Sequence, residues 1–142
     1  MIRTVEEKDA YAIKEICEKS LGYSTNVEII EKRITELKQN PHYYIIVAEE
    51  DEEVVGFMEA EKYDLIYGER GYNLIVLGVL PAYQDKGYGK MLIEALEKEV
   101  IDNKASFIRL NSRVERKGAH GFYEHLGYEW KKTQKNFKKK VG

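Results

Sequence analysis

The residues best suited to do chemistry in this chain form a glycine-rich turn, Gln-Asp-Lys-Gly-Tyr-Gly at 84–89, between an apolar run and a helical pattern. The first turn of a helix has unpaired backbone N–H groups, and the helix dipole favours an anion there. Gly87 and Gly89 let several of those groups converge on one phosphate, and Lys86 and Lys90 add positive charge. The turn therefore predicts a phosphate-binding site.

Three phosphate-binding patterns compete for this turn. A Walker A loop needs G-x-x-x-x-G-K-[ST], but Gln84 stands five residues before Gly89, and the residue after the lysine is Met91. The dinucleotide fingerprint G-x-G-x-x-G needs a glycine where this chain has Leu92. The pattern that remains is Q/R-x-x-G-x-G, formed by Gln84, Gly87 and Gly89.

That pattern resembles a motif of the GCN5-related N-acetyltransferase (GNAT) superfamily, where it holds the pyrophosphate of acetyl-CoA. Residues 77–96, "LGVLPAYQDKGYGKMLIEAL", are similar to the longer stretch L-x-V-x-P-x-x-Q/R-x-x-G-x-G. Residues 111–128, "NSRVERKGAHGFYEHLGY", resemble a later motif of the family, an asparagine followed by A-x-x-F-Y-x-x-x-G-[FY]. The opening, "IRTVEEKDAYAIKEI", is also typical of it. The resemblance covers most of the chain.

The resemblance implies a set of site residues for acetyl-CoA, the co-substrate. The backbone N–H groups of 86–90, with Gln84 leading into them, would hold the pyrophosphate. The strand before the loop would pair with the pantetheine arm, and one of its N–H groups would polarise the thioester carbonyl as in an oxyanion hole. The implied contacts are Leu77, Gly78, Val79, Gln84, Asp85, Lys86, Gly87, Tyr88, Gly89, Lys90 and Asn111.

Tyr123 occupies the position where the family usually places a tyrosine near the CoA sulfur. A phenol with a pKa of about 10 can protonate the departing thiolate, so the resemblance implies that Tyr123 is catalytic. Structural alternatives stand beside each role: the turn could hold no ligand, Tyr123 could simply pack with Phe122 and Leu126, and Asn111 could be an ordinary residue before a helix.

The general base is not assigned by the sequence. The attacking amine must lose a proton, since an ammonium has no lone pair. Some family members carry a glutamate four residues before the position of Leu77, where this chain has Asn73, which is no base at neutral pH. A water chain, an amine that arrives neutral or one of four carboxylates remains, although each carboxylate alone reads as a solvated surface group: Glu59, Glu61, Asp64 and Glu69.

Hydrophobic periodicity predicts the elements that position these residues. We expect strands over Ile2–Val5, Tyr43–Ala48, 54–60, 72–80 and 106–110, with one or two more over 128–140. We expect helices from about Lys8 to Ser20 with Gly22 as the stop, from a Thr25–Glu28 capping box to Asn40, from Gly87 to about Asn103, and from a Ser112–Glu115 capping box to Leu126, stopped by Gly127. The acidic run 49–53 should be a hairpin turn and 61–71 a loop.

This order predicts an α/β, mixed α+β fold, in which strands 72–80 and 106–110 are parallel. The family resemblance implies a GNAT-like fold with a mostly antiparallel sheet of about six to seven strands and about four helices. With 142 residues, two prolines and no linker composition, the chain should be a single domain over 1–142.

Bulk composition narrows the function classes. A net charge of −2 argues against a whole-surface grip on nucleic acid. The single cysteine, Cys17, excludes an internal disulfide and, with no signal-peptide character and no apolar stretch that could span a bilayer, predicts a cytoplasmic protein without a membrane partner. Three scattered histidines, with His120 and His125 five apart, do not form a metal site.

The sequence thus predicts an N-acetyltransferase that moves an acetyl group from acetyl-CoA to a primary amine, in a small molecule or a peptide, by direct attack in a ternary complex. Two alternatives stay open: a non-catalytic acyl-CoA sensor, and a nucleic-acid partner that uses the six C-terminal lysines among Tyr128, Trp130 and Phe137. The acidic run could also attract a cationic amine. Homodimers are common among such folds, but no residue here specifies one.

Overall fold

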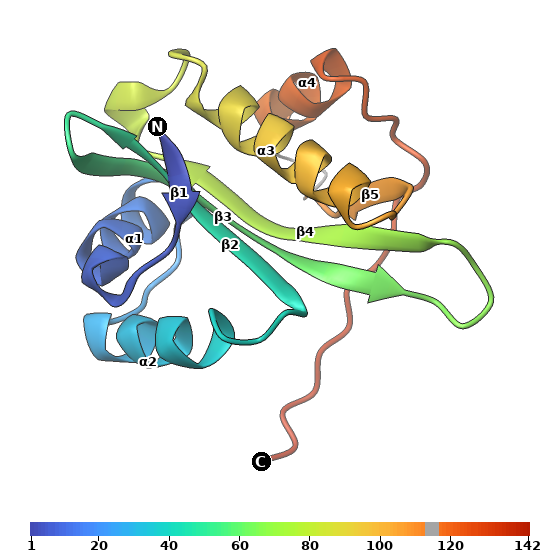
Figure 1. Cartoon of the computed structure of the whole chain (residues 1–142), viewed down its shortest axis with the longest axis horizontal. Coiled ribbons are helices and arrows are strands. Elements are labelled where there is room, and N and C mark those ends of the chain that lie inside the picture. The colour runs from blue at the N-terminus through green and yellow to red at the C-terminus, as the bar shows by residue number, and fades with distance from the viewer. Residues whose placement is uncertain (113–116) are drawn as a thin grey trace. The chain divides into compact units, whose positions relative to one another are not determined.

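The computed structural model describes residues 1–112 and 117–142, which form two compact units, Met1–Leu110 and Asn111–Gly142. The first unit is built on a five-stranded sheet in the order β1-β2-β3-β4-β5 (Figure 1). Strands β1 to β4 are antiparallel and β5 is parallel to β4, which confirms the mixed, mostly antiparallel sheet and the parallel pair. The strands are β1 (Ile2–Thr4), β2 (Tyr43–Glu50), β3 (Glu53–Asp64), β4 (Arg70–Val79) and β5 (Phe107–Leu110).

Helices cover both faces of this sheet (Figure 1). Helices α1 (Ala10–Ile16) and α2 (Val27–Leu37) lie on one face, and α3 (Tyr88–Asp102) lies on the other. The apolar residues that recur at helical spacing in α1 and α2 meet inward-facing residues of β2 and β3 in one core cluster, which includes Ile13, Ile16, Ile34, Val47 and Phe57. None of the helices in the described part of the chain has the length and apolar character that a bilayer span needs.

Helix boundaries follow the predicted signals except at one cap. A 3-10 turn (Glu7–Asp9) precedes α1, a π-turn (Cys17–Leu21) extends it, and Gly22 ends it with φ at 75°. The Thr25–Glu28 capping box is wrong: Asn26 is the N-cap of α2, and its side-chain oxygen accepts from the N–H of Ile29 at 2.9 Å. Asn26 has the extended backbone that brings a cap side chain over the third helical N–H.

The loop predicted over 61–71 is confirmed only over residues 65–69, because β3 runs to Asp64 and β4 begins at Arg70. Residues 61–64 pair with residues 70–73 across a long hairpin. Cross-strand side-chain pairs stabilise these strand ends without an alternating apolar pattern. Gly71 is a strand residue for a packing reason: a Cβ there would lie 2.3 Å from the ring of Phe107. The glycine marks a close side-chain approach rather than a turn.

The second unit contains α4 (Lys117–His125), which ends before Gly127 at φ 94°, as predicted. The predicted capping residue Glu115 lies outside the described residues. The strands predicted over 128–140 are wrong, since residues 128–142 carry no regular secondary structure, and the sheet therefore has fewer strands than expected. The six lysines leave this segment too little apolar surface to offset the ordering of a strand.

Candidate active site

Strand β4 has an open edge in its second half. Strand β5 pairs with β4 only from Gly71 to Leu74, whereas β4 continues to Val79 along β3. The register between β3 and β4 shifts at Ile75, because Glu59 pairs with Val76 while Ala60 pairs with Leu74. Such a bulge re-aims a strand and ends pairing on one side. Residues 75–79 thus have no strand partner on that side within the described part of the chain.

Backbone alternation shows which groups face this open edge. The N–H of Leu80 donates to the carbonyl of Val55 at 2.8 Å, so the polar groups of Val79 and Leu77 point away from β3. The Val79 carbonyl is already engaged: it accepts from Ser20 Oγ at 2.6 Å and from Gln84 Nε2 at 3.1 Å. The edge therefore offers the N–H and carbonyl of Leu77 and the N–H of Val79.

Gly78, between these two residues, serves the packing of α1. A Cβ at this buried position would lie 2.7 Å from Ile16 Cγ2 and 3.1 Å from Leu21 Cδ1. The absence of a side chain lets the end of α1 and its π-turn sit directly on β4. This contact fixes the backbone on either side of Gly78.

The turn after β4 has the open backbone that the sequence predicts. A 3-10 turn (Pro81–Tyr83) follows the strand, and Asp85 and Gly87 both have left-handed φ, 68° and 89°. Gly87 is the N-cap of α3 and has no side chain to occupy the first free N–H groups of the helix. In the described part of the chain, no atom beyond its chain neighbours lies within 4 Å of the position of a Cβ on Gly87. The exposed loop can therefore receive an anion on its N–H groups.

A carboxylate from the β2–β3 hairpin holds this loop. Glu50 Oε1 accepts from the hydroxyl of Tyr88 at 2.5 Å, and Glu50 Oε2 lies 3.9 Å from Lys86 Nζ. Lys86 Nζ lies 4.9 Å from the ring centroid of Tyr83, and that ring contacts the ring of Tyr88 edge to face. The hydrogen bond to Glu50 raises the pKa of Tyr88 to about 12, so its hydroxyl stays a donor at neutral pH.

The sequence pattern does not indicate this role of Glu50, because the acidic run 49–53 predicts only a hairpin turn. The chain does turn there, at Asp51 and Glu52 with φ of 52° and 67°, as expected. The turn brings Glu50 to a residue 38 positions away in the sequence. No local spacing encodes that contact.

Asn73 joins a polar network across three strands. Its Nδ2 donates to Glu61 Oε2 at 2.9 Å, and its Oδ1 accepts from Arg109 Nη1 at 2.8 Å. His42 Nε2 lies 3.2 Å from the other oxygen of Glu61, and the Arg109 guanidinium stacks over the ring of Tyr63 at 4.8 Å. Asn73 is no base, but it orients a carboxylate on its cross-strand partner Glu61.

The four candidate carboxylates for a base have different surroundings. Asp64 is exposed and lies 3.8 Å from Arg70, and Glu69 accepts from Ser106 Oγ at 2.6 Å. Glu59 is half-buried, and its cross-strand partner Val76 comes directly before Leu77. Burial, and then the negative charge of Glu61, raise the pKa of the Glu59 carboxyl. A raised pKa makes a carboxylate a stronger base.

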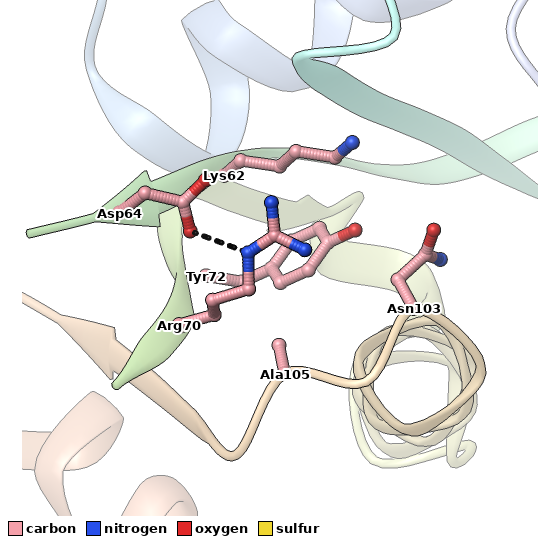
Figure 2. Close-up of a pocket in the computed structure, with 7 residues that line it drawn as sticks. Lys62, Asp64, Arg70, Tyr72, Asn103 and Ala105 are labelled. Carbon is pink, nitrogen blue, oxygen red and sulfur yellow. Dashed lines mark ion pairs between the residues drawn. The ribbon is translucent and has the colours of Figure 1, made fainter. Parts of the chain in front are cut away.

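A small hollow at the far end of α3 is separate from this loop. Its lining includes Lys62, Asp64, Arg70, Tyr72 and Asn103, and Asp64 and Arg70 form an ion pair with one another (Figure 2). Helix α3 has 15 residues, so it places this hollow about 22 Å from the loop at its N-terminus. The hollow, at ≈ 60 Å³, is far smaller than an ordinary ligand pocket.

Asn111 and Tyr123 belong to the second unit. Asn111 directly follows β5, and Tyr123 lies in α4, half-buried, with the rings of Phe122 and Tyr128 at 5.2 and 5.9 Å. The carbonyl of Tyr123 accepts from the N–H groups of Leu126 and Tyr128 at 3.1 and 3.0 Å, which closes the end of the helix. Their predicted roles toward acetyl-CoA stay predictions.

Comparisons with known proteins agree with this architecture. Residues 9–128 match the model of the acetyltransferase (GNAT) family. A protein described as an acetyltransferase from Yersinia pestis (strain Pestoides F) is 33% identical over 97 residues, which are 68% of this chain and 64% of that protein. The chain spans less than two thirds of the length of the curated relatives it matches first.

Solved structures share the fold at low identity. The aminoglycoside antibiotic 6'-N-acetyltransferase AAC(6')-Ig from Acinetobacter haemolyticus has a TM-score of 0.82 at 18% identity, covering 100% of this chain and 99% of that one. The aminoglycoside N-acetyltransferase AAC(6')-Iy, solved in complex with CoA, has a TM-score of 0.84 at 18% identity, covering 99% and 95%. With the family match over 9–128, this chain belongs to the GNAT family of acetyltransferases.

Proposed function

We propose that this protein is an acetyl-CoA-dependent N-acetyltransferase that acts on a primary amine by direct attack in a ternary complex. One observation carries the proposal: the open edge of β4 at Leu77–Val79 is followed, after one 3-10 turn, by the exposed loop before α3. Both surfaces offer backbone donors, which suit the amides of a pantetheine arm and the oxygens of a pyrophosphate. Membership of the GNAT family supports this donor.

Each part of acetyl-CoA has a proposed set of binding residues. The N–H groups of 86–90 hold the pyrophosphate, and Lys86 and Lys90 add positive charge. Gln84 acts indirectly, since its side chain ties the loop to the end of β4 through the Val79 carbonyl. Leu77 pairs with the arm, and Asn111 contacts it as the family resemblance implies.

The proposed chemistry is an acyl transfer in which Glu59 gains a proton from the amine, Tyr123 loses one to the thiolate, and proton exchange with solvent restores both groups. The nitrogen lone pair of the amine attacks the thioester carbon, and the N–H of Leu77 stabilises the oxyanion that forms. The intermediate collapses to an amide and a thiolate, which takes a proton from Tyr123. Glu59 takes the proton that the amine nitrogen releases, directly or through a water, because its raised pKa and its place beside Val76 favour it over the other three carboxylates.

Direct attack fits the surroundings of the single cysteine. Cys17 lies in the π-turn after α1, and burial, then the charge of Glu18, raise the pKa of its thiol. A nucleophilic cysteine needs the opposite shift, toward thiolate. A covalent acetyl-enzyme on Cys17 is therefore not part of the proposal.

Calorimetry with acetyl-CoA, followed by a thiol-release assay over an amine panel, tests the function. The panel includes an aminoglycoside, a polyamine and a lysine peptide, because structural neighbours include aminoglycoside acetyltransferases. Binding with thiol release supports the proposal. Binding of acetyl-CoA without thiol release with any amine favours an acyl-CoA sensor. The asparagine at position 73, in place of a glutamate, argues for that alternative. Absence of binding refutes both.

Two variants test the proposed acid and base. Tyr123→Phe should lower kcat with little change in the Kd of acetyl-CoA, and equal loss of both would mean a structural tyrosine. Glu59→Gln should lower kcat/KM about 100-fold, in the range of general-base effects. Glu69→Gln is the matched control. Equal activity of the two glutamine variants would remove Glu59 from the mechanism.

A further inference from the structure

We propose that Glu50 is a positioning residue that presets the loop 84–90 and so determines its affinity for the pyrophosphate of acetyl-CoA. The inference rests on the proposed function, since it takes pyrophosphate as the ligand of this loop. Glu50 itself does not touch the ligand in this proposal. It acts through Tyr88 and Lys86.

The contacts of Glu50 join two elements that are distant in the sequence. Glu50 is the last residue of β2, and its side chain is 31% exposed. Tyr88 is the first residue of α3, so the 2.5 Å hydrogen bond between them fixes the start of the helix against the hairpin. The same carboxylate lies 3.9 Å from Lys86 Nζ, two residues earlier in the loop. One side chain thus restrains both ends of the Lys86–Tyr88 segment.

This segment needs such a restraint. Asp85 has a left-handed backbone although it carries a Cβ, and such conformations persist only where their surroundings impose them. Gly87 is conformationally free, and no side chain of the described residues caps α3. Residues 84–87 are exposed, so few packing contacts hold them. Ordering a loop on binding costs free energy and so weakens the affinity for the ligand, whereas a loop that is already ordered avoids this cost.

Electrostatics alone predicts the opposite sign. Glu50 is an anion beside a site for an anion, so removing its charge would strengthen binding if repulsion dominated. Lys86 lies close enough to compensate part of that charge. The direction in which a Glu50 variant shifts the Kd therefore separates positioning from repulsion.

Calorimetry with CoA on four variants measures that direction. Glu50→Ala should weaken CoA binding about tenfold, the equivalent of one hydrogen bond to a charged group. Glu50→Gln should weaken it less, because its amide oxygen still accepts from Tyr88. Tyr88→Phe should weaken binding no more than Glu50→Ala does, because it leaves the Lys86 contact of Glu50 in place. The double variant should be no weaker than Glu50→Ala, since Glu50→Ala already removes the contact with Tyr88.

Glu53→Ala is the matched control. Glu53 is the cross-strand partner of Glu50, is exposed, and makes no hydrogen bond or ion pair that is seen in the described residues. It removes the same charge from the same hairpin, so its Kd should stay within about twofold. Tighter or unchanged binding in Glu50→Ala, or additive losses in the double variant, overturns the inference. Melting curves confirm that each variant is folded.

A second readout needs no CoA and keeps this inference separate from the proposed function. We expect trypsin to cleave after Lys86 mainly when the loop leaves its preset conformation, because proteolysis follows local opening. In the free protein, Glu50→Ala should be cut there several times faster than Glu53→Ala. Wild-type protein that binds no CoA would refute the proposed function, whereas equal cleavage rates would refute the positioning role of Glu50 whatever the CoA result.

Discussion

Replacing Gly87 with alanine separates the two reasons for a glycine at this position. One reason is backbone conformation, because φ at Gly87 is 89°. The other is access, because no atom of the described residues lies within 4 Å of the place where a Cβ would be. The first reason affects the stability of the fold, and the second affects the binding of a ligand.

The stability effect can be estimated from the backbone alone. Alanine in the left-handed region costs about 1 to 2 kcal/mol, and the open space around Gly87 adds no steric term. Urea denaturation of Gly87→Ala should therefore show a loss of that size in the free energy of unfolding.

The effect of Gly87→Ala on the affinity for acetyl-CoA should be large compared with its effect on stability. A methyl group on Gly87 would project beside the free N–H groups of α3, and a shift of φ to relieve strain would turn those groups away. A hydrogen bond to a charged group is worth about 1.5 to 3 kcal/mol. Loss of one such bond to the pyrophosphate should weaken acetyl-CoA binding roughly 10- to 150-fold in calorimetry.

Gly22→Ala is the control for this prediction. Gly22 also has a left-handed backbone, with φ at 75°, and also lies at a helix end. Among residues 1–112 and 117–142, no atom beyond its chain neighbours lies within 4 Å of the place where its Cβ would be. Gly22→Ala should lose the same stability and keep its affinity. Two results would refute the reasoning: equal weakening of acetyl-CoA binding in both variants, or an unchanged Kd in Gly87→Ala. Either would show that position 87 does not need glycine for the close approach of a phosphate.

Three further variants test the packing and charge of the first unit. Gly78→Ala should lose about 1 to 3 kcal/mol of unfolding free energy in urea, because its Cβ would lie 2.7 Å from Ile16 Cγ2; full stability would show that α1 shifts freely on β4. Asp9→Ala should lose about 3 kcal/mol of unfolding free energy, because Asp9 is 3% exposed and accepts two hydrogen bonds from Arg3 at 2.8 and 2.9 Å. A loss below about 1 kcal/mol would contradict a structural role for this ion pair. Burial raises the folded-state pKa of Glu59, so the stability that this group contributes is present at low pH and is lost as pH rises through that pKa. Glu59→Gln should therefore melt above wild type at about pH 8 and match it near pH 3.5. A difference in melting temperature that does not depend on pH would contradict burial as the cause.

The local elements of the proposed donor site could be predicted from the sequence. The spacing of Gln84, Gly87 and Gly89 indicated an open turn before a helix, and the structure has Gly87 in the left-handed region at the start of α3. The parallel β4–β5 pair and the glycine stops at Gly22 and Gly127 were equally predictable. These features depend on backbone preferences of residues close together in the chain, which a sequence displays directly.

Contacts between distant residues were decided by the tertiary structure alone. Glu50 meets Tyr88, and Asn73 links Glu61 to Arg109, because strand register and hairpin turns bring them together. Residues of these types occur on any solvated surface, so their local pattern carries no signal of the contact. The sequence determined the likeness to acetyl-CoA-binding folds and the conformation of the phosphate loop, whereas only the packed sheet decided which side chains hold that loop and surround the candidate base, since register relates residues that no local period connects.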